Sequence, residues 1–179
     1  AWARTQRAHL GLQLLDPLEQ LLDDRVQRVG QVGHVEVQVG KPAIKQAKMI
    51  SAEVSGVIGL SGDVIGSVVL SFPGDSACKL ASAFAGTPLS MDSPDFTDAI
   101  GELANMVAGN AKKDFEGYNA SISLPSVIIG PGHSVSQSKV SPFLIIPCET
   151  SMGSFSVEIA LMTNKKAATG RPALAGAMS

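Results

Sequence analysis

The sequence is poor in the side chains that carry most acid–base, redox and metal chemistry. Its 179 residues include three histidines, two cysteines, one tryptophan and one tyrosine. It has no His-x-x-x-His pattern, cysteine pair or carboxylate cluster of the kind that binds a metal ion. It also has no Gly-x-Ser-x-Gly elbow, and its scattered histidines do not suggest a Ser/His/Asp triad. A chain with so little acid–base equipment would catalyse a reaction mainly by positioning a reactant on a partner.

Charge and long apolar runs are scarce as well. The charged fraction is 17%, the net charge is −2 and the pI is near 5.9, with no basic cluster, which argues against a nucleic-acid surface. No apolar run reaches the roughly 18 residues of a membrane-spanning helix, and the first ten residues lack the layout of a secretory signal. Cys78 and Cys148 are far apart, so we expect buried thiols in a reducing cytoplasm rather than a disulfide. The hydrophobic fraction of 45% is enough for one domain with a sizeable core.

The strongest positive pattern lies in residues 93–117, which we predict to form one long helix. Ser93 suits the N-cap, Pro94 suits the first helical position, and Gly117 suits the end. The acidic residues near the start are explained better by the helix dipole than by a cation site, and lysines suit the last turn. The acidic residues are Asp92, Asp95 and Asp98, and the lysines are Lys112 and Lys113. Apolar residues at spacings of three and four predict one buried face: Phe96, Ile100, Leu103, Val107 and Ala111.

A polar face is expected on the opposite side of this helix, at about 100° per residue. It comprises Asp98, Glu102, Asn105 and Gly109. Small residues surround Glu102 and Asn105, namely Gly101, Ala108 and Gly109. Because a glycine inside a helix costs roughly 1 kcal/mol relative to alanine, close approach by another surface is one explanation for the two glycines. An ordinary solvated face is the other interpretation of the pattern.

Residues 101–112, with the sequence GELANMVAGNAK, resemble the signature helix of the CheX/CheC family of chemotaxis phosphatases, in which Glu-x-x-Asn is the catalytic motif. The resemblance depends on the longer context, which is the flanking Gly101, the apolar positions after the Asn, and AGN at 108–110. A second stretch, SGVIGLSGDVIGSVVLSF at 55–72, resembles the hairpin that precedes this helix in CheX-type proteins. The resemblance covers roughly residues 35–162. A second Glu-x-x-Asn match at 116–119 runs off the helix end, so we expect one active site per chain.

The fold class expected is α+β: an antiparallel sheet of about six strands with two longer helices packed on it, as in CheC-like proteins. Alternating or apolar runs predict strands at 35–39, 54–60, 64–72, 120–129, 139–148 and 153–162. Residues 61–63 form a hairpin loop that lacks the Gly-Lys-Ser/Thr ending of a phosphate-binding loop, and residues 130–133 form a turn. A short helix follows Pro73 and ends at Gly86. We divide the chain into an N-terminal helix and linker (1–33), a CheX/CheC-like domain (34–162) and a flexible tail (163–179).

The resemblance implies an enzyme, a phosphatase of a phosphorylated CheY-like response-regulator receiver domain in bacterial chemotaxis. Asn105 would position the attacking water, and Glu102 would dock to the receiver's active-site lysine. Partner-binding residues would be Asp98, Gly101, Gly109 and Lys112. The chain would have no cofactor or metal of its own, because the receiver supplies Mg²⁺. The resemblance also implies a homodimer made by strand pairing, for which the last strand could serve as an exposed sheet edge.

Two other functions remain open at this stage. A non-catalytic module could bind a receiver or a flagellar switch without hydrolysis, although the intact Glu102/Asn105 pair speaks against it. A ligand-binding sensor domain would need a lined pocket, which a sequence cannot show.

Overall fold

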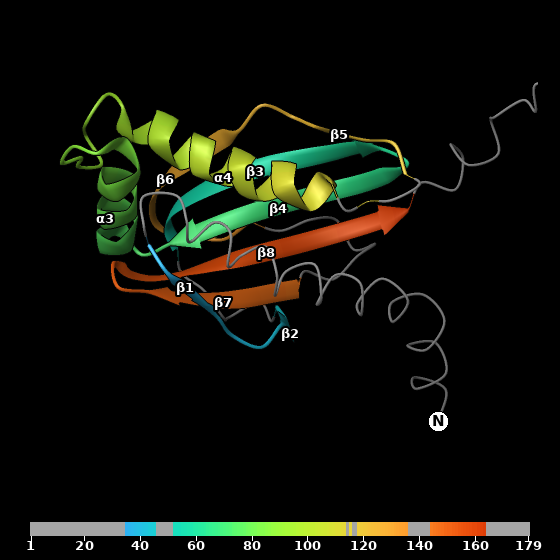
Figure 1. Cartoon of the computed structure of the whole chain (residues 1–179), viewed down its shortest axis with the longest axis horizontal. Coiled ribbons are helices and arrows are strands. Elements are labelled where there is room, and N and C mark those ends of the chain that lie inside the picture. Colours follow the sequence, from blue (N-terminus) through green and yellow to red (C-terminus); the bar gives the residue numbers. More distant parts are fainter. Residues whose placement is uncertain (1–34, 46–51, 114, 116–117, 136–143, 164–179) are drawn as a thin grey trace, which may run out of the picture.

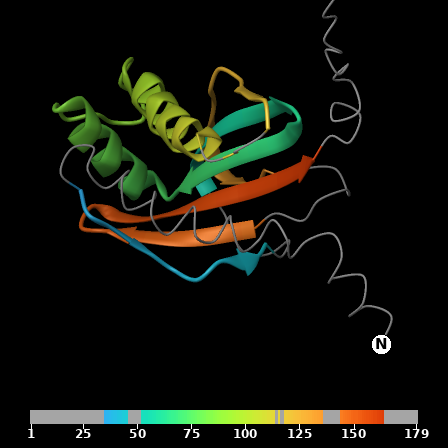
Figure 2. The same ribbon diagram turned by 45° about the vertical axis from the view of Figure 1, so that its right-hand side comes forward.

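The computed structural model describes residues 35–45, 52–113, 115, 118–135 and 144–163, which form one antiparallel sheet with two helices on it (Figure 1). The elements are β1 (Val37–Val39), β2 (Ala43–Ile44), β3 (Ala52–Gly62), β4 (Val64–Phe72), α3 (Gly74–Ala85), α4 (Phe96–Lys112), β5 (Ala120–Ile122), β6 (Ser126–His133), β7 (Leu144–Thr150) and β8 (Gly153–Thr163). Both helices lie on the same face of the sheet (Figure 2). The predicted α+β fold is confirmed. The predicted N-terminal helix and linker, and the tail beyond Thr163, lie outside the described residues.

The sheet has eight strands in the order β1-β7-β8-β4-β3-β5, with β2 also paired to β7 and β6 also paired to β3. The number exceeds the expected six for two reasons. The predicted strand at 120–129 is divided before Pro125 into β5 and β6, which both pair with β3. The second reason is the short strand β2, which no pattern predicts. Pro125 therefore precedes a strand, as a residue without a backbone donor should.

Strand β8 lies between β4 and β7, pairing with β4 over residues 156–163 and with β7 over residues 153–159. The prediction that the last strand is an exposed sheet edge is therefore wrong. Every residue from Phe155 to Ala160 is buried, so both faces of β8 are covered rather than one. Among the described strands, the outer positions of the sheet belong to β1 and β2 on one side and to β5 and β6 on the other.

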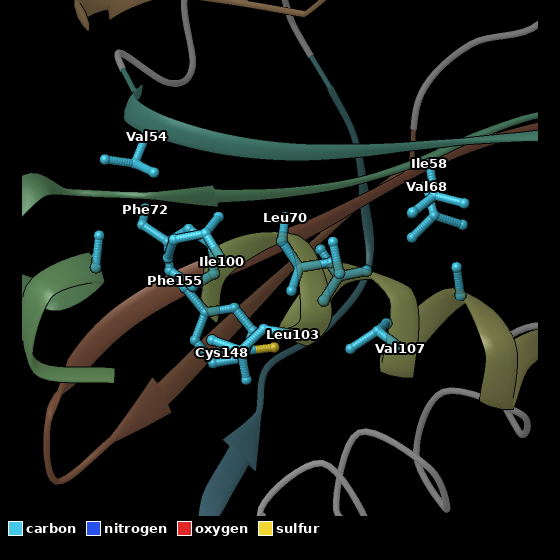
Figure 3. Packing of buried hydrophobic residues seen from close by; sticks show 14 of the residues in the cluster. Val54, Ile58, Val68, Leu70, Phe72, Ile100, Leu103, Val107, Cys148 and Phe155 are labelled. Carbon is cyan, nitrogen blue, oxygen red and sulfur yellow. The ribbon is translucent and has the colours of Figure 1, made fainter. Parts of the chain in front are cut away.

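The core lies between the helices and the sheet face that they cover. Alternate residues of the strands point into it, as the two-residue period of a strand requires. Figure 3 shows Val54, Ile58, Val68, Leu70 and Phe72 of β3 and β4 against Ile100, Leu103 and Val107 of α4. The rings of Phe72 and Phe155 stack with their centroids 5.5 Å apart. From α3, Ala77 and Ala81 are fully buried against this core.

The opposite face of the sheet buries polar side chains. Glu158 of β8 is 1% exposed, and its Oε2 accepts a hydrogen bond from Lys45 Nζ at 2.5 Å. Ser55 and Ser71, on β3 and β4, are buried with their hydroxyls 3.2 Å apart. His133 Nε2 lies 2.8 Å from Ser55 Oγ. The pairing of these groups lets them be buried beside a small apolar cluster of Val69 and Ala160 on the same face.

Residues 130–133 are the end of strand β6 and not the turn predicted from Gly130–Pro131–Gly132. His133 pairs with Ala52 of β3, after a register shift between Ala52 and Val54. Gly132 has φ 72°, a left-handed conformation that glycine adopts without steric cost, so the strand can bulge and continue.

Helix α4 approaches β3 so closely that Gly56 has no room for a side chain. A Cβ atom at Gly56 would lie 2.9 Å from Ala104 Cβ and 3.3 Å from the carbonyl oxygen of Ile100. Both contacts are shorter than ordinary van der Waals separations, and one is to helix backbone. The glycine at position 56 therefore sets the distance between α4 and the sheet.

Substitution Gly56→Ala should push α4 away from β3 and lower the free energy of unfolding by about 1–3 kcal/mol, the usual cost of overpacking a core. Gly59→Ala is the matched control, because a Cβ there would meet Ser123 Oγ at an ordinary 3.6 Å. Urea unfolding of both variants measures the effect. Equal stability of the two variants would contradict this account of Gly56.

The two cysteines are free thiols in different surroundings. Cys148 is fully buried in the core (Figure 3), whereas Cys78 is half-buried on α3. Burial, with a smaller contribution from the Glu149 carboxylate, raises the pKa of Cys148 from 9.0 to about 12. The expectation of thiols rather than a disulfide is confirmed, and the Cys148 thiol stays protonated in the folded chain.

The raised pKa of Cys148 predicts a loss of stability at alkaline pH. Above pH 9.0 the thiol ionises in the unfolded chain but not in the folded one, so rising pH stabilises the unfolded state relative to the folded one until the pH reaches about 12. Between pH 8 and pH 10 this contribution lowers the free energy of unfolding by about 1.4 kcal/mol. Urea unfolding at both pH values should show a larger decline for the wild type than for Cys148→Ala. An identical decline in the two proteins would refute the shift.

Candidate active site

Helix α4 begins at Phe96, three residues later than Ser93. The predicted N-cap role of Ser93 is wrong, because its hydroxyl accepts a hydrogen bond from the Ser90 N–H at 2.9 Å. Its carbonyl oxygen accepts from the Phe96 N–H at 3.0 Å, which closes the turn before the helix. Asp98 lies in the first turn, where the helix dipole favours a carboxylate. The helix ends at Lys112, and the predicted end at Gly117 lies outside the described residues.

The inward face of α4 is wider than the apolar spacing predicts. Phe96, Ile100, Leu103 and Val107 are buried, as expected, whereas Ala111 is only half-buried. Four small residues are buried as well: Ala99, Gly101, Ala104 and Ala108. The helix contacts β3 and β4 below it and β5 and β6 at its side, so more of its circumference is covered than one sheet face could cover.

Glu102 and Asn105 lie on the part of α4 that remains open to solvent. Glu102 is exposed and Asn105 is half-buried. Residues three apart on a helix are neighbours, with Cβ atoms about 5–6 Å apart, so the two side chains can act on one reactant. No hydrogen bond or ion pair between described residues involves either side chain. As far as the described residues go, the carboxylate and the amide are therefore available to a partner.

The predicted partner-binding residues fall into different surroundings. Asp98 and Lys112 are exposed, and Gly109 is half-buried. Gly101 is buried, and a Cβ atom there would lie 3.2 Å from Pro125 Cγ. The prediction that Gly101 and Ala108 keep the open face free of bulk is wrong, because both are covered by the chain itself. Gly101 instead lets the segment between β5 and β6 lie against the helix.

That segment is a part of the site that the sequence analysis missed. Ser123 accepts a hydrogen bond from the Gly59 N–H through its Oγ, and its own N–H donates to the Gly59 carbonyl, both at 2.9 Å. The Ser123 hydroxyl also donates to the Leu124 carbonyl at 2.7 Å. Treating residues 120–129 as one strand concealed the segment. Pro125 was the signal that the strand is interrupted here.

The second Glu-x-x-Asn match does not form a comparable pair. Asn119 follows α4 instead of lying on it, and its N–H donates to Asp63 Oδ2 at 2.8 Å. Glu116 lies outside the described residues.

Metal ligands do not gather in the described part of the chain: no three His, Cys, Asp or Glu side chains there could hold one ion. None of the helices it contains is long and apolar enough to cross a membrane. The described residues do line an apolar cavity of about 30 Å³ between α3, α4 and β1, which has room for little more than a water molecule. A larger depression of about 530 Å³ beside α3 is open to solvent and is lined in part by Cys78, Leu89 and Met152.

Comparison with known proteins identifies the family of this chain. The family model described as Chemotaxis phosphatase CheX matches residues 54–149, which include α3, α4 and most of β3 and β7. The curated CheY-P phosphatase CheX of Thermotoga maritima is 33% identical over 99 residues, which make up 54% of this chain and 64% of that relative. This chain therefore spans less than two thirds of the relative's length.

Solved structures show the same similarity over more of the chain. The chemotaxis protein CheX of Desulfovibrio desulfuricans superposes with a TM-score of 0.72 at 29% identity, covering 80% of this chain and 97% of that one. The CheX–CheY–BeF3–Mg+2 complex of Borrelia burgdorferi gives a TM-score of 0.61 at 26% identity, with 82% and 94% covered. Because the family model matches more than half of its residues, this chain belongs to the CheX family of chemotaxis phosphatases.

Proposed function

We propose that this protein removes the phosphoryl group from the phosphorylated aspartate of a CheY-like receiver domain. The observation that carries the proposal is the placement of Glu102 and Asn105 one turn apart on the open side of α4, with neither side chain bonded within the described residues. The Thermotoga maritima relative is named as a CheY-P phosphatase, and the Borrelia burgdorferi relative was solved with CheY, BeF3 and Mg+2. Both names support a receiver domain as the partner. Cytoplasmic location is part of the proposal.

The reaction needs little chemistry from this chain. An aspartyl phosphate is a reactive acyl phosphate, and the receiver holds Mg²⁺ and a lysine around it. Hydrolysis requires a water in line with the phosphorus, so that the new O–P bond forms as the bond to the aspartate oxygen breaks. The products are inorganic phosphate and a free carboxylate, and the water's protons leave with the phosphate and the solvent.

Asn105 is suited to orient that water. An amide both donates and accepts hydrogen bonds and does not titrate, so it can hold a water in one orientation at any physiological pH. The glutamine that positions water in GTPases has the same function. Because the water is already held in line with the phosphorus, much of the entropic part of the activation barrier is removed.

Glu102 is suited to set the docking register. Its carboxylate can accept a charge-assisted hydrogen bond from the receiver's active-site lysine. With Glu102 anchored on the lysine, Asn105 lies one turn further along the helix, toward the phosphoryl group. Asp98 and Lys112 lie at the two ends of the same helix and can contact the receiver around this pair, whereas Gly109 leaves the backbone accessible between them.

Homodimer formation by strand pairing also remains a prediction from the family resemblance. Because β8 is interior, the pairing would use an outer strand such as β6 or β1. Sedimentation of the wild type at micromolar concentration tests this prediction, and a monomeric mass would count against it.

Substitution Asn105→Ala should lower the rate of receiver dephosphorylation at least about a hundredfold, as removal of a positioned hydrogen-bonding group in an active site typically does. The side chain is partly exposed and bonds to nothing described, so stability should change by no more than about 0.5 kcal/mol. Asn110→Ala is the matched control, because Asn110 lies on the same helix with its Oδ1 3.3 Å from Lys113 Nζ. The assay follows loss of phosphate from a receiver charged with acetyl phosphate in Mg²⁺.

Three results of this assay would revise the proposal. If Asn105→Ala keeps most of the activity, the water-positioning role is wrong. If the wild type binds the charged receiver without accelerating hydrolysis, the protein is an interaction module. If it neither binds nor acts on any receiver of its source organism, the proposal fails. Hydrolysis of p-nitrophenyl phosphate is not expected, because that substrate brings no lysine or Mg²⁺.

Substitution Glu102→Lys should weaken receiver binding more than Glu102→Gln, because it places a cation against the receiver lysine. Glu36→Lys makes the same charge change at an exposed residue that precedes β1 and is not on α4, and controls for net charge. Titration of each variant against a beryllofluoride-charged receiver gives the dissociation constants. Equal values for the wild type and Glu102→Lys would remove Glu102 from the interface.

A further inference from the structure

Leu124 is the most exposed large apolar side chain in the described part of the chain, at 88%. The next is Ile44 at 56%. Exposed leucines are common on protein surfaces, so exposure alone indicates nothing about function. What distinguishes Leu124 is the backbone that holds it and the part of α4 that its segment lies against.

The backbone at Leu124 is fixed on both sides. On one side, Ser123 exchanges hydrogen bonds with Gly59 of β3 and donates one to the Leu124 carbonyl. On the other side, Pro125 has a restricted φ and lies against Gly101 of α4. The exposed side chain therefore projects from a segment that is already ordered. An apolar group presented in this way loses little conformational freedom on binding, which favours affinity.

The position of Leu124 along α4 follows from two contacts. Near one end of the segment, Ile122 Cδ1 would lie 3.9 Å from a Cβ at Gly109, and near the other, Pro125 Cγ would lie 3.2 Å from a Cβ at Gly101. The segment thus runs antiparallel to the helix along its side, beside the two turns from residue 101 to residue 109 (Figures 1 and 2). Leu124 lies between these contacts, beside the turn that carries Glu102 and Asn105.

We infer that Leu124 is a docking residue that enters an apolar depression of the receiver domain next to its phosphorylation site, and that it contributes to the choice of receiver. The inference rests on the proposed function. A specific interface buries about 800 Å² on each partner, and the segment that carries Leu124 adjoins the open stripe of α4. An interface of this size centred on Asn105 would include that segment. The receiver that fits presents a lysine for Glu102 and an apolar surface for Leu124 side by side.

The test compares Leu124→Asp with Leu124→Met and with Ile44→Asp. Ile44 is the matched control, because it is also an exposed apolar residue but lies on β2 at the far side of the sheet. Affinity for a beryllofluoride-charged receiver and the KM and kcat for an acetyl-phosphate-charged receiver are measured, with sedimentation to give the mass. Leu124→Asp should raise Kd and KM at least about tenfold and leave kcat unchanged, whereas Leu124→Met and Ile44→Asp should stay within about threefold of the wild type.

The outcomes separate this inference from the proposed function. If the wild type accelerates hydrolysis and Asn105→Ala does not, but Leu124→Asp binds like the wild type, the inference fails and the proposed function stands. If Leu124→Asp loses affinity while the wild type shows no acceleration, the docking role holds and the phosphatase proposal fails. If Leu124→Asp changes the mass without changing receiver affinity, a second copy of the chain covers Leu124 and the inference is wrong. If the wild type binds no receiver, both fail.

Discussion

The close packing of α4 against its surroundings is the constraint on which the rest of the structure depends. The helix makes two close contacts with other elements at glycine residues, Gly56 of β3 below it and its own Gly101 at its side. Gly56 lets the helix lie on β3, and Gly101 lets Pro125 lie on the helix. With both contacts made, the rotation of α4 about its own axis is fixed. The same rotation decides that Glu102 and Asn105 face outward.

The other face of the sheet follows a different design. Glu158 is almost completely buried but is paired with Lys45, which also donates to the Val135 carbonyl at 2.9 Å. Removing either partner would leave a buried charge, which typically costs several kcal/mol. The pair therefore holds the residues around β2 and those after β6 over the central strands. Side chains in the middle of the sheet are in this way kept from water on the face that the helices leave uncovered.

The sequence predicted the elements that depend on local patterns. Strand β4 was located to the residue, and the buried face and polar pair of α4 follow from a period of 3.6. The position of β8 could not be predicted in the same way. Its alternation of Phe155, Ser156, Val157 and Glu158 is typical of a strand with one solvent-exposed face. Glu158 is nevertheless buried, because Lys45, 113 residues away in sequence, pairs with its carboxylate. A partner so distant in the chain leaves no local signal.

The site was predictable only in part for a related reason. The spacing of Glu102 and Asn105 is a local property, and it places both on one side of the helix. Whether a glycine on that helix faces a partner or the chain itself depends on which other segment packs there. The family resemblance and the lack of side-chain bulk around the polar pair both favour a partner at Gly101, whereas the segment between β5 and β6 lies there. The pattern could not show that Pro125 returns to the helix.

The placement of the polar pair on an open helix face, rather than in a cleft, has a kinetic consequence. If the proposed function is right, the complete active site exists only while the two proteins are in contact, because residues of both proteins form it. The attacking water is enclosed at encounter, and phosphate is released when the complex separates. Turnover then cannot exceed the rate at which the spent receiver departs. Tighter docking would increase the capture of charged receivers but would lengthen each visit, so the best affinity for signalling is an intermediate one.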